Sequence, residues 1–236
     1  MYELTTYANG VAVLPFALNK GGVYNVEVFY LGDEDYRGSD ASAKITIEKI
    51  ATKTTAAAKT YLATAKTKSF SATLKDAKGN VLANKKVTFT VNGKTYTATT
   101  NAKGVATVKL ALTAAKTYTV TIKFAGDGVY AASTVSAKVT LNKEKTKITA
   151  PKKTFKRTAK TKKVVITLKN SKGKAIAKKK ITLTVNKKKY TVKTNKKGQA
   201  TFKVKLTKKG TKKYTVKFAG DSQYKAVKKT GKIVIK

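Results

Sequence analysis

Hydrophobic and polar residues alternate along most of the chain with a period of two. In ITLTV, residues 181–185, the apolar residues Ile181, Leu183 and Val185 alternate with two threonines. In FKVKL, residues 202–206, three apolar side chains alternate with two lysines. A period of two is typical of β-strands in antiparallel sheets with one buried and one solvated face. The abundance of Thr, Val and Tyr agrees with this, so we expect an all-β protein.

Turn sequences separate these stretches at short intervals. Asn92-Gly93 is a typical two-residue hairpin turn. NAKG at 101–104 and NKKG at 195–198 predict four-residue turns whose glycine can adopt a positive φ. About seven short strands without a helical pattern favour an immunoglobulin-like β-sandwich. In residues 51–142 they are predicted at 55–64, 69–75, 86–91, 94–100, 105–112, 117–124 and 130–141.

The chain aligns with itself without gaps at a shift of 94 residues. FAGDGVY at 124–130 returns as FAGDSQY at 218–224 and has a third version, YLGDEDY, at 30–36. The sequence therefore predicts tandem immunoglobulin-like sandwiches of about seven strands each, the first of them only a C-terminal half. The predicted divisions are a first partial repeat, a middle repeat and a lysine-rich last repeat, at residues 1–50, 51–142 and 143–236.

The first partial repeat begins in the middle of the pattern, because Tyr2 aligns with Tyr96. We therefore expect the chain to be a fragment of a longer protein, in which an upstream segment completes residues 1–50. The alternative is an open half-domain completed by a strand from another chain. In either case half a sandwich would expose its inner face to water, so residues 2–47 should pack less well than the other repeats.

Composition excludes several kinds of chemistry. The 236 residues include no Cys, His or Trp, which excludes zinc and iron–sulfur ligation, cysteine nucleophiles and histidine-based triads. No run of 18 apolar residues predicts a membrane span, and the start of the chain shows no signal peptide. We expect no enzymatic activity, no cofactor and no small-molecule substrate.

The recurring Gly-Asp-x-x-Tyr sequence predicts a structural corner. Calcium requires six to eight oxygen ligands, yet the middle and last repeats contain two acidic residues each. We therefore predict no metal and no catalytic residues, and interpret each Asp as an acceptor for nearby backbone amides and each Tyr as packing back on the sandwich. The corner residues are Asp33, Tyr36, Asp127, Tyr130, Asp221 and Tyr224. In the first partial repeat a weak calcium site remains the alternative to a solvated acidic loop, at Asp33, Glu34, Asp35 and Asp40.

A second tyrosine position recurs at the start of the penultimate strand. Tyr118 occupies it in the middle repeat and Tyr24 in the first. Sandwich folds place a corner tyrosine there, whose hydroxyl bonds to upstream backbone. In the last repeat Lys212 takes this position, and Tyr214 follows two residues later on the same face.

Net charge rises steeply along the chain. Basic and acidic residues number 4 and 7 in the first partial repeat, 14 and 2 in the middle repeat, and 34 and 2 in the last. Edge-strand lysines that deter aggregation explain only part of this excess, and the remainder is self-repulsive unless a polyanion neutralises it. We predict polyanion binding by lysines around two consecutive hairpin turns: Lys178, Lys179, Lys180, Lys187, Lys188, Lys189, Lys196 and Lys197.

The basic residues are 50 Lys and only two Arg, Arg37 and Arg157. Arg reads phosphates and base edges in bidentate fashion, whereas Lys acts as a hydrated point charge. No groove-reading helix and no exposed aromatics among the charges are predicted. We therefore favour an anionic cell-wall or surface polymer as the partner. Binding to nucleic acid would be only non-specific and strongly salt-dependent.

One long run carries a family resemblance. GNVLANKKVTFTVNGKTYTATTNAKGVATVKL at 79–110, followed by YTVTIKFAGDGVY at 118–130, resembles the bacterial-type immunoglobulin-like repeats of large surface adhesins. It is most similar to the lysine-rich repeats of adhesin-like proteins from methanogenic archaea. The resemblance implies an extracellular, cell-surface or cell-wall location and a non-enzymatic stalk. The basic last repeat would associate with the wall polymer, and a non-specific polyanion- or nucleic-acid-binding module is the alternative.

Overall fold

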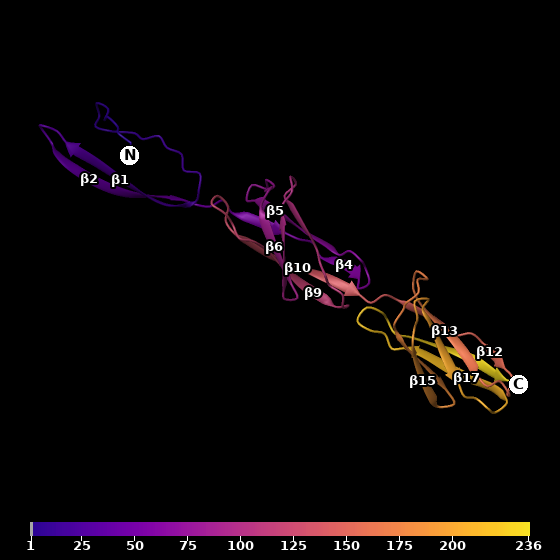
Figure 1. Ribbon diagram of the computed structural model, residues 1–236. Coiled ribbons are helices and arrows are strands. Elements are labelled where there is room, and N and C mark those ends of the chain that lie inside the picture. The colour runs from indigo at the N-terminus through magenta and orange to yellow at the C-terminus, as the bar shows by residue number, and fades with distance from the viewer. Residues whose placement is uncertain (1) are drawn as a thin grey trace. The chain divides into compact units, whose positions relative to one another are not determined.

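The computed structural model describes residues 2–236, all of whose regular elements are β-strands (Figure 1). The strands follow the turn sequences of the chain and are short, as the alternating pattern predicts. They are β1 (Gly22–Gly32), β2 (Arg37–Ile47), β3 (Thr52–Thr55), β4 (Lys59–Leu62), β5 (Ser69–Asp76), β6 (Lys86–Val91), β7 (Lys94–Thr99), β8 (Val105–Lys109), β9 (Thr117–Phe124), β10 (Ser133–Asn142), β11 (Thr146–Thr149), β12 (Lys153–Phe155), β13 (Lys162–Asn170), β14 (Lys180–Val185), β15 (Lys188–Lys193), β16 (Gln199–Val204), β17 (Gly210–Phe218) and β18 (Val227–Ile235).

The strands form the paired sheets of tandem immunoglobulin-like sandwiches, and the predicted all-β fold class is confirmed. The middle repeat contributes sheets β3-β5-β8 and β4-β10-β9-β6-β7. The last repeat contributes β11-β13-β16 and β12-β18-β17-β14-β15, in the same order of chain segments. Among residues 2–50 the one sheet is the antiparallel hairpin β1-β2, which corresponds to β9 and β10 at the 94-residue spacing.

The prediction of a single strand at 55–64 is wrong, because two separate strands, β3 and β4, occupy this part of the chain. β3 pairs antiparallel with β5, and β4 pairs parallel with β10 in the other sheet. Three alanines, 56–58, separate the two strands. The last repeat repeats this switch with β11 and β12, around Pro151. Alternation shows which residues face inward, but it does not show which sheet supplies the partner strand.

By its contacts the chain divides into two compact units. One comprises the residues up to Ala57 with Phe70–Val108 and Thr119–Ala137, and the other comprises Ala58–Ser69, Lys109–Tyr118 and Lys138–Lys236. Within the first unit, Phe70 of β5 meets Phe89 of β6 edge to face, with ring centroids 6.3 Å apart. Such pairs add to the stabilisation from burial and here join the three-stranded sheet to the five-stranded one.

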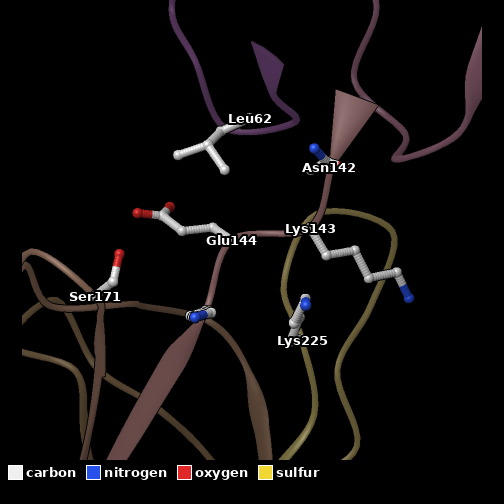
Figure 2. A pocket seen from close by; sticks show the side chains of 7 residues that line it. Leu62, Asn142, Lys143, Glu144, Ser171 and Lys225 are labelled. Atoms are coloured by element: carbon white, nitrogen blue, oxygen red, sulfur yellow. The ribbon is translucent and has the colours of Figure 1, made fainter. Parts of the chain in front are cut away.

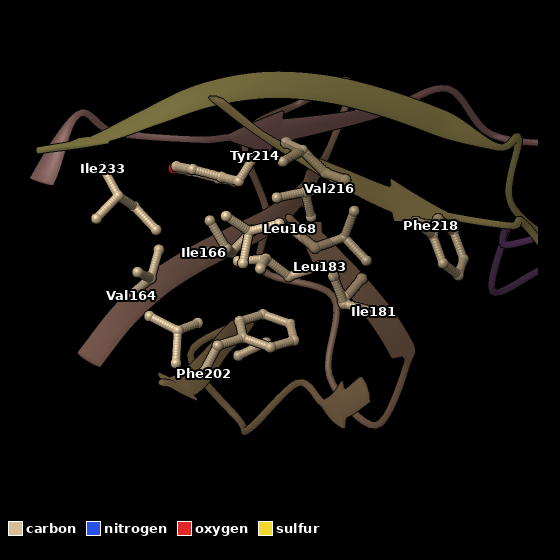
Figure 3. Close-up of a cluster of buried hydrophobic side chains, with 14 of the residues drawn as sticks. Val164, Ile166, Leu168, Ile181, Leu183, Phe202, Tyr214, Val216, Phe218 and Ile233 are labelled. Carbon is tan, nitrogen blue, oxygen red and sulfur yellow. The ribbon is translucent and has the colours of Figure 1, made fainter. Parts of the chain in front are cut away.

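The core of the last repeat fills the space between its two sheets (Figure 3). Ile181 and Leu183 of β14 and Phe202 of β16 are completely buried, as the alternation predicts. Each such side chain stabilises the fold by about 1.5–3 kcal/mol. Lys203, next to Phe202 in β16, is exposed. Burial of one face therefore leaves the lysines of each strand on the other face.

In the last repeat the corner tyrosine lies two residues later than in the other repeats, and a glycine on the neighbouring strand makes room for it. Tyr214 of β17 is fully buried, and its hydroxyl donates to the carbonyl oxygen of Pro151 at 2.7 Å. Burial raises the pKa of Tyr214 to about 12. Its neighbour on β18 is Gly231, where an added Cβ would lie 2.3 Å from the tyrosine ring. The middle repeat has Val120 and Ala137 at the equivalent positions, so a larger residue on one strand is matched by a smaller one on the next.

The hairpin β1-β2 exposes the face that is buried in the middle repeat. Val28 is 61% exposed, whereas its equivalent Ile122 is completely buried. Phe16 is 49% exposed, whereas Leu110 is 4% exposed. The strands that cover this face in the middle repeat have no counterpart among residues 2–50. The expectation that half a sandwich exposes its inner face is confirmed.

Hydrogen exchange should reveal this difference directly. Because β1 and β2 pair only with each other, their amides should exchange by local opening, at least tenfold faster than those of β14 and β17. Exchange of the intact chain, followed by mass spectrometry of its peptides, measures both regions in one sample. Equal protection of residues 22–47 and of the last repeat in a monomer would contradict the assignment.

The pair Tyr214–Gly231 should behave as one packing unit. Gly231→Ala should lower the free energy of unfolding of the last repeat by about 1–3 kcal/mol through overpacking. Adding Tyr214→Val restores the pair found in the middle repeat and should recover much of this loss, a coupling that urea denaturation of the single and double variants measures. Additive losses in the double variant would show that the two positions are independent.

Candidate functional site: repeated corners and lysine surfaces

The three Gly-Asp-x-x-Tyr sequences form the same hydrogen-bonded corner. In the middle repeat, Oδ1 of Asp127 accepts from the amides of Val129 and Tyr130, at 2.9 and 2.8 Å. The Asp127 amide donates in turn to the carbonyl oxygen of Tyr130 at 2.9 Å. The corresponding bonds occur in the other corners, at Asp221 with Gln223 and Tyr224, and at Asp33 with Asp35 and Tyr36. That these residues serve structure rather than chemistry stays a prediction.

The glycine of each corner is required by both its conformation and its surroundings. Gly126 has φ +80°, and a Cβ there would lie 2.9 Å from backbone atoms of Tyr130 and Ala132. Gly32 and Gly220 have φ +86° and +79° and equally close backbone neighbours. A side chain would therefore be strained and would also collide with the returning strand.

The second carboxylate oxygen of the corner aspartate binds a lysine in both later repeats. Nζ of Lys85 lies 2.6 Å from Oδ2 of Asp127 and 4.7 Å from the ring centroid of Tyr130. Lys179 makes the same pair with Asp221 at 2.6 Å and lies 5.1 Å from the ring centroid of Tyr224. The first corner has no such lysine, and there Oδ2 of Asp33 accepts from the Tyr30 hydroxyl.

These bonds lower the pKa of the corner aspartates. The hydrogen bond from Lys85, followed by those from two amides, lowers the pKa of Asp127 to about 2 from 3.8. At Asp221, burial pulls the pKa upward, but the bonds from Lys179 and two amides outweigh it and the pKa is lowered. The carboxylates are therefore already engaged as structural acceptors at neutral pH.

Each later corner also contacts the end of the preceding repeat. Within the first compact unit, the Gly21 amide donates to the carbonyl oxygen of Gly128 at 2.7 Å, and Ile50 forms a bridge with Tyr130. Within the second unit, the Ala115 amide donates to the carbonyl oxygen of Ser222 at 2.8 Å, in the same role as Gly21. Glu144, at the start of the last repeat, takes the place of Ile50 and bridges to Tyr224 within that repeat. The corner therefore links successive repeats through backbone hydrogen bonds.

Glu144 is a buried acid at the second of these links. It is 4% exposed, and its Oε2 accepts from the Thr64 hydroxyl at 2.8 Å. A hollow of about 430 Å³ lies beside it (Figure 2). Six of its seven lining residues are polar or charged, unlike the apolar clefts that hold most small ligands. The lining residues are Leu62, Asn142, Lys143, Glu144, Lys145, Ser171 and Lys225.

Two further lysines are buried at strand starts, Lys68 just before β5 and Lys162 as the first residue of β13. Lys68 is 5% exposed, and its Nζ donates to the carbonyl oxygen of Ala65 at 2.7 Å. Burial lowers the pKa of this Lys68 ammonium. Lys162 is its equivalent and donates to the carbonyl oxygens of Ala159 at 2.8 Å and Arg157 at 3.1 Å. Sequence reasoning missed these lysines, whose only signal was their spacing of 94 residues.

The predicted corner tyrosines are confirmed in the first two repeats. The Tyr118 hydroxyl donates to the carbonyl oxygen of Ala114 at 2.8 Å, and the Tyr24 hydroxyl donates to that of Lys20 at 2.9 Å. Both bonds reach four residues upstream and fix the entry to the penultimate strand.

The eight lysines predicted from the turns of the last repeat are spread along the β14-β15 edge of their sheet. Lys180 pairs with Lys193, and Val185 pairs with Lys188 at the far end of the hairpin. Residues 178–180 and 196–197 therefore lie at one end, and residues 187–189 lie at the other. Lys179 differs from the rest because it is held by Asp221. Polyanion binding by these lysines stays a prediction.

The structure brings together a second set of lysines, of which sequence reasoning had named only Lys180 and Lys189. They lie on the outward positions of β14, β15, β17 and β18, and we name them the outer lysine face. The sequence signal for this face was the same period-two alternation that located the core residues. The core lies at the apolar positions of the pattern, and the lysine face lies at its polar positions. The face comprises Lys180, Lys189, Lys193, Lys213, Lys217, Lys228 and Lys232.

Residues 2–236 contain neither a metal-binding cluster nor a membrane-spanning helix. This part of the chain holds no group of three acidic, His or Cys side chains placed to hold a metal ion. It also has no helix with the length and apolar character needed to cross a membrane.

One known domain family matches part of the chain. Residues 55–140 match the bacterial Ig-like domain (group 1). No curated protein matches the chain. The alignment of residues 55–140 covers most of the middle repeat, and residues 149–234 are their equivalents at the 94-residue spacing.

Several solved structures of adhesion proteins align with the chain at low identity and low TM-score. A tetra-tandem repeat from the extending region of a large adhesion protein aligns at 18% identity and a TM-score of 0.43, over 92% of this chain and 57% of the other. Invasin, a bacterial integrin-binding protein, aligns at 18% identity and a TM-score of 0.47, over 75% of this chain and 38% of its own. A Ca²⁺-stabilised adhesin of an Antarctic bacterium aligns at 17% identity and a TM-score of 0.30, over 97% and 61%. The chain thus spans less than two thirds of the length of each of these structures.

The corner bonds should be separable by substitution. Asp127→Asn keeps an acceptor for the two amides but loses the charge, and should cost about 0–1 kcal/mol of unfolding free energy. Asp127→Ala also loses the amide bonds and should cost about 1–3 kcal/mol. Urea denaturation of both variants measures the difference, and equal losses would contradict the role assigned to the amide bonds.

The same variants test the pH dependence. Because the folded-state pKa of Asp127 is about 2 and its ordinary value is 3.8, its stabilising contribution is present above about pH 4 and is lost as the pH falls toward 2. The fall in urea midpoint between pH 4 and pH 2 should therefore be smaller in Asp127→Asn than in the parent chain. An unchanged fall in the variant would exclude a contribution from this carboxylate.

Proposed function

We propose that this chain is a non-enzymatic stalk segment of a cell-surface, adhesin-like protein, and that its last repeat associates with an anionic polymer of the cell wall or surface. The association with an anionic polymer is supported by the uncompensated positive charge of the last repeat. The last repeat has 34 basic and two acidic residues. Of the two acids, Glu144 is buried and Asp221 is paired with Lys179.

The stalk role is supported by tandem immunoglobulin-like repeats and by the family match over residues 55–140. The corner contacts support it further, since each later corner is bonded to the end of the preceding repeat. Such repeated links suit a protein that spaces one site from another. An extracellular location at the cell surface or wall, and similarity to repeats of methanogenic archaea, belong to this proposal.

The proposal includes a partner for the first partial repeat. Its inner face is apolar and exposed, as Val28 and Phe16 show. The equivalent face in the middle repeat is covered by the sheet containing β5. We therefore propose that an upstream segment or another chain supplies the covering strands for residues 1–50.

Binding to the polymer would be multivalent and electrostatic. Individual lysine–anion contacts at the surface are weak and screened by salt, with a Debye length of about 8 Å at physiological ionic strength. Many such contacts on one domain act together and give useful affinity through effective concentration. The preponderance of Lys over Arg suits a flexible polymer without a fixed geometry.

A non-specific nucleic-acid-binding module is the second candidate, favoured by the same positive charge. Single-stranded nucleic acid is usually held by exposed aromatic side chains on which bases stack. All six aromatic side chains of the last repeat are buried or half-buried. The wall polymer therefore remains the function that the surface chemistry supports better.

A salt titration separates the two candidates. The intact chain should bind isolated anionic wall material at physiological salt, with an affinity that falls steeply as salt increases. Duplex DNA should bind more weakly under the same conditions, and wall material stripped of its anionic polymer should not bind. Equal or tighter binding to DNA, measured by co-sedimentation and by anisotropy, would overturn the wall-polymer assignment.

A further inference from the structure

The lysines of the outer lysine face are arranged in opposed pairs. In the β17-β18 ladder, Lys213 lies opposite Lys232, and Lys217 lies opposite Lys228. In the β14-β15 hairpin, Lys180 lies opposite Lys193. Directly opposed residues of an antiparallel pair have Cβ atoms about 4.5–5.5 Å apart, and like charges at these positions are destabilising.

No acidic side chain of the last repeat relieves this repulsion. Asp221 is held at the corner by Lys179, and Glu144 is buried beside Thr64. The face therefore presents three like-charge pairs whose counter-charge must come from outside the repeat.

The fold does not require these lysines, as the middle repeat shows. At the seven equivalent positions it has only three lysines, Lys86, Lys123 and Lys138. The other four positions carry threonine, a β-branched residue that suits strands well. These four are Thr95, Thr99, Thr119 and Thr134, in place of Lys189, Lys193, Lys213 and Lys228. The additional charge thus lies on outward strand positions of a scaffold that is otherwise the same.

Hydroxyl groups lie between the lysine pairs. The row Thr184, Thr215 and Thr230 crosses the sheet through directly paired positions. It separates the Lys217–Lys228 pair from the Lys213–Lys232 pair, which lie four residues apart along β17, or about 13 Å. An anionic group placed over this row would meet ammonium groups on both sides and hydroxyl donors beneath it.

We propose that the outer lysine face is the docking surface for a linear, flexible polyanion that carries a phosphate or carboxylate in each repeating unit. This rests on the proposed function and locates it on one sheet of the last repeat. The polymer lies over β14, β15, β17 and β18, and neutralises the opposed lysines. Its binding relieves repulsion within the ladder, so the polymer also stabilises the folded repeat.

The test compares two variants of the intact chain that lose the same charge. The face variant carries Lys189→Thr, Lys193→Thr, Lys213→Thr and Lys228→Thr. The control variant carries Lys152→Ala, Lys163→Ser, Lys174→Asn and Lys205→Ala, at exposed positions outside the face and outside the eight lysines predicted from the turns. Every substitution introduces the residue that the middle repeat has at the equivalent position. Both variants therefore remain compatible with the fold, and thermal melting confirms this.

Binding is measured across a salt series with polyphosphate and with poly-L-glutamate, which distinguish phosphate from carboxylate. Each lost lysine–anion contact should make the slope of log K against log salt shallower by about 0.7–0.9. The four substitutions of the face variant should therefore make its slope shallower by about 3. Its affinity at physiological salt should fall at least tenfold, and that of the control variant less than threefold. Without ligand and at low salt, the face variant should also melt at a higher temperature than the parent, because all three like-charge pairs are broken.

The outcomes separate the two levels of the proposal. Failure of the parent chain to bind either polymer would overturn the proposed function itself. Equal losses in the face and control variants, with binding by the parent, would overturn only the assignment to this face. Tighter binding to duplex DNA than to both polymers, abolished in the face variant, would keep the surface but overturn the polymer as its occupant.

Discussion

Burial of alternate side chains between two sheets is the constraint on which the rest of the structure depends. It places Ile181, Leu183 and Phe202 in the core and sends every second residue to solvent. Because the inner positions are fixed by packing, the outer positions are free to vary, and the last repeat fills them with lysine. The hairpin β1-β2 shows the consequence of losing the constraint, since its inner face is left exposed.

The corners connect this scaffold from one repeat to the next. A glycine with positive φ and an aspartate that accepts two amides fix the turn, while a lysine holds the remaining carboxylate oxygen. The same loop receives backbone bonds from the preceding repeat. The few acids of the later repeats are thus largely consumed by structure, which is why the lysines on the strands have no internal counter-charge.

Much of this could be predicted from the sequence, and the remainder depends on contacts between distant segments. Alternation located most strands and the inward residues, and the 94-residue repeat revealed both the corners and the half-domain. Neither could show that the strand predicted at 55–64 divides between two sheets, because the pattern does not specify a partner. The Lys85–Asp127 pair, the fit of Tyr214 against Gly231 and the opposed lysines of β17 and β18 likewise arise from register. The turn lysines stand out because they are consecutive in the sequence, whereas most lysines of the outer lysine face are dispersed at alternate positions of separate strands.

The central claim is that the inner faces carry the fold and the outer lysine face carries the binding. Its most direct test is NMR observation of backbone amides and lysine side chains while the intact chain is titrated with polyphosphate. The account predicts that chemical-shift changes concentrate on Lys213, Lys217, Lys228, Lys232 and their strand neighbours, with core amides nearly unchanged. Changes confined to the turns around residues 187 and 196, or spread evenly over all lysines of the chain, would contradict it.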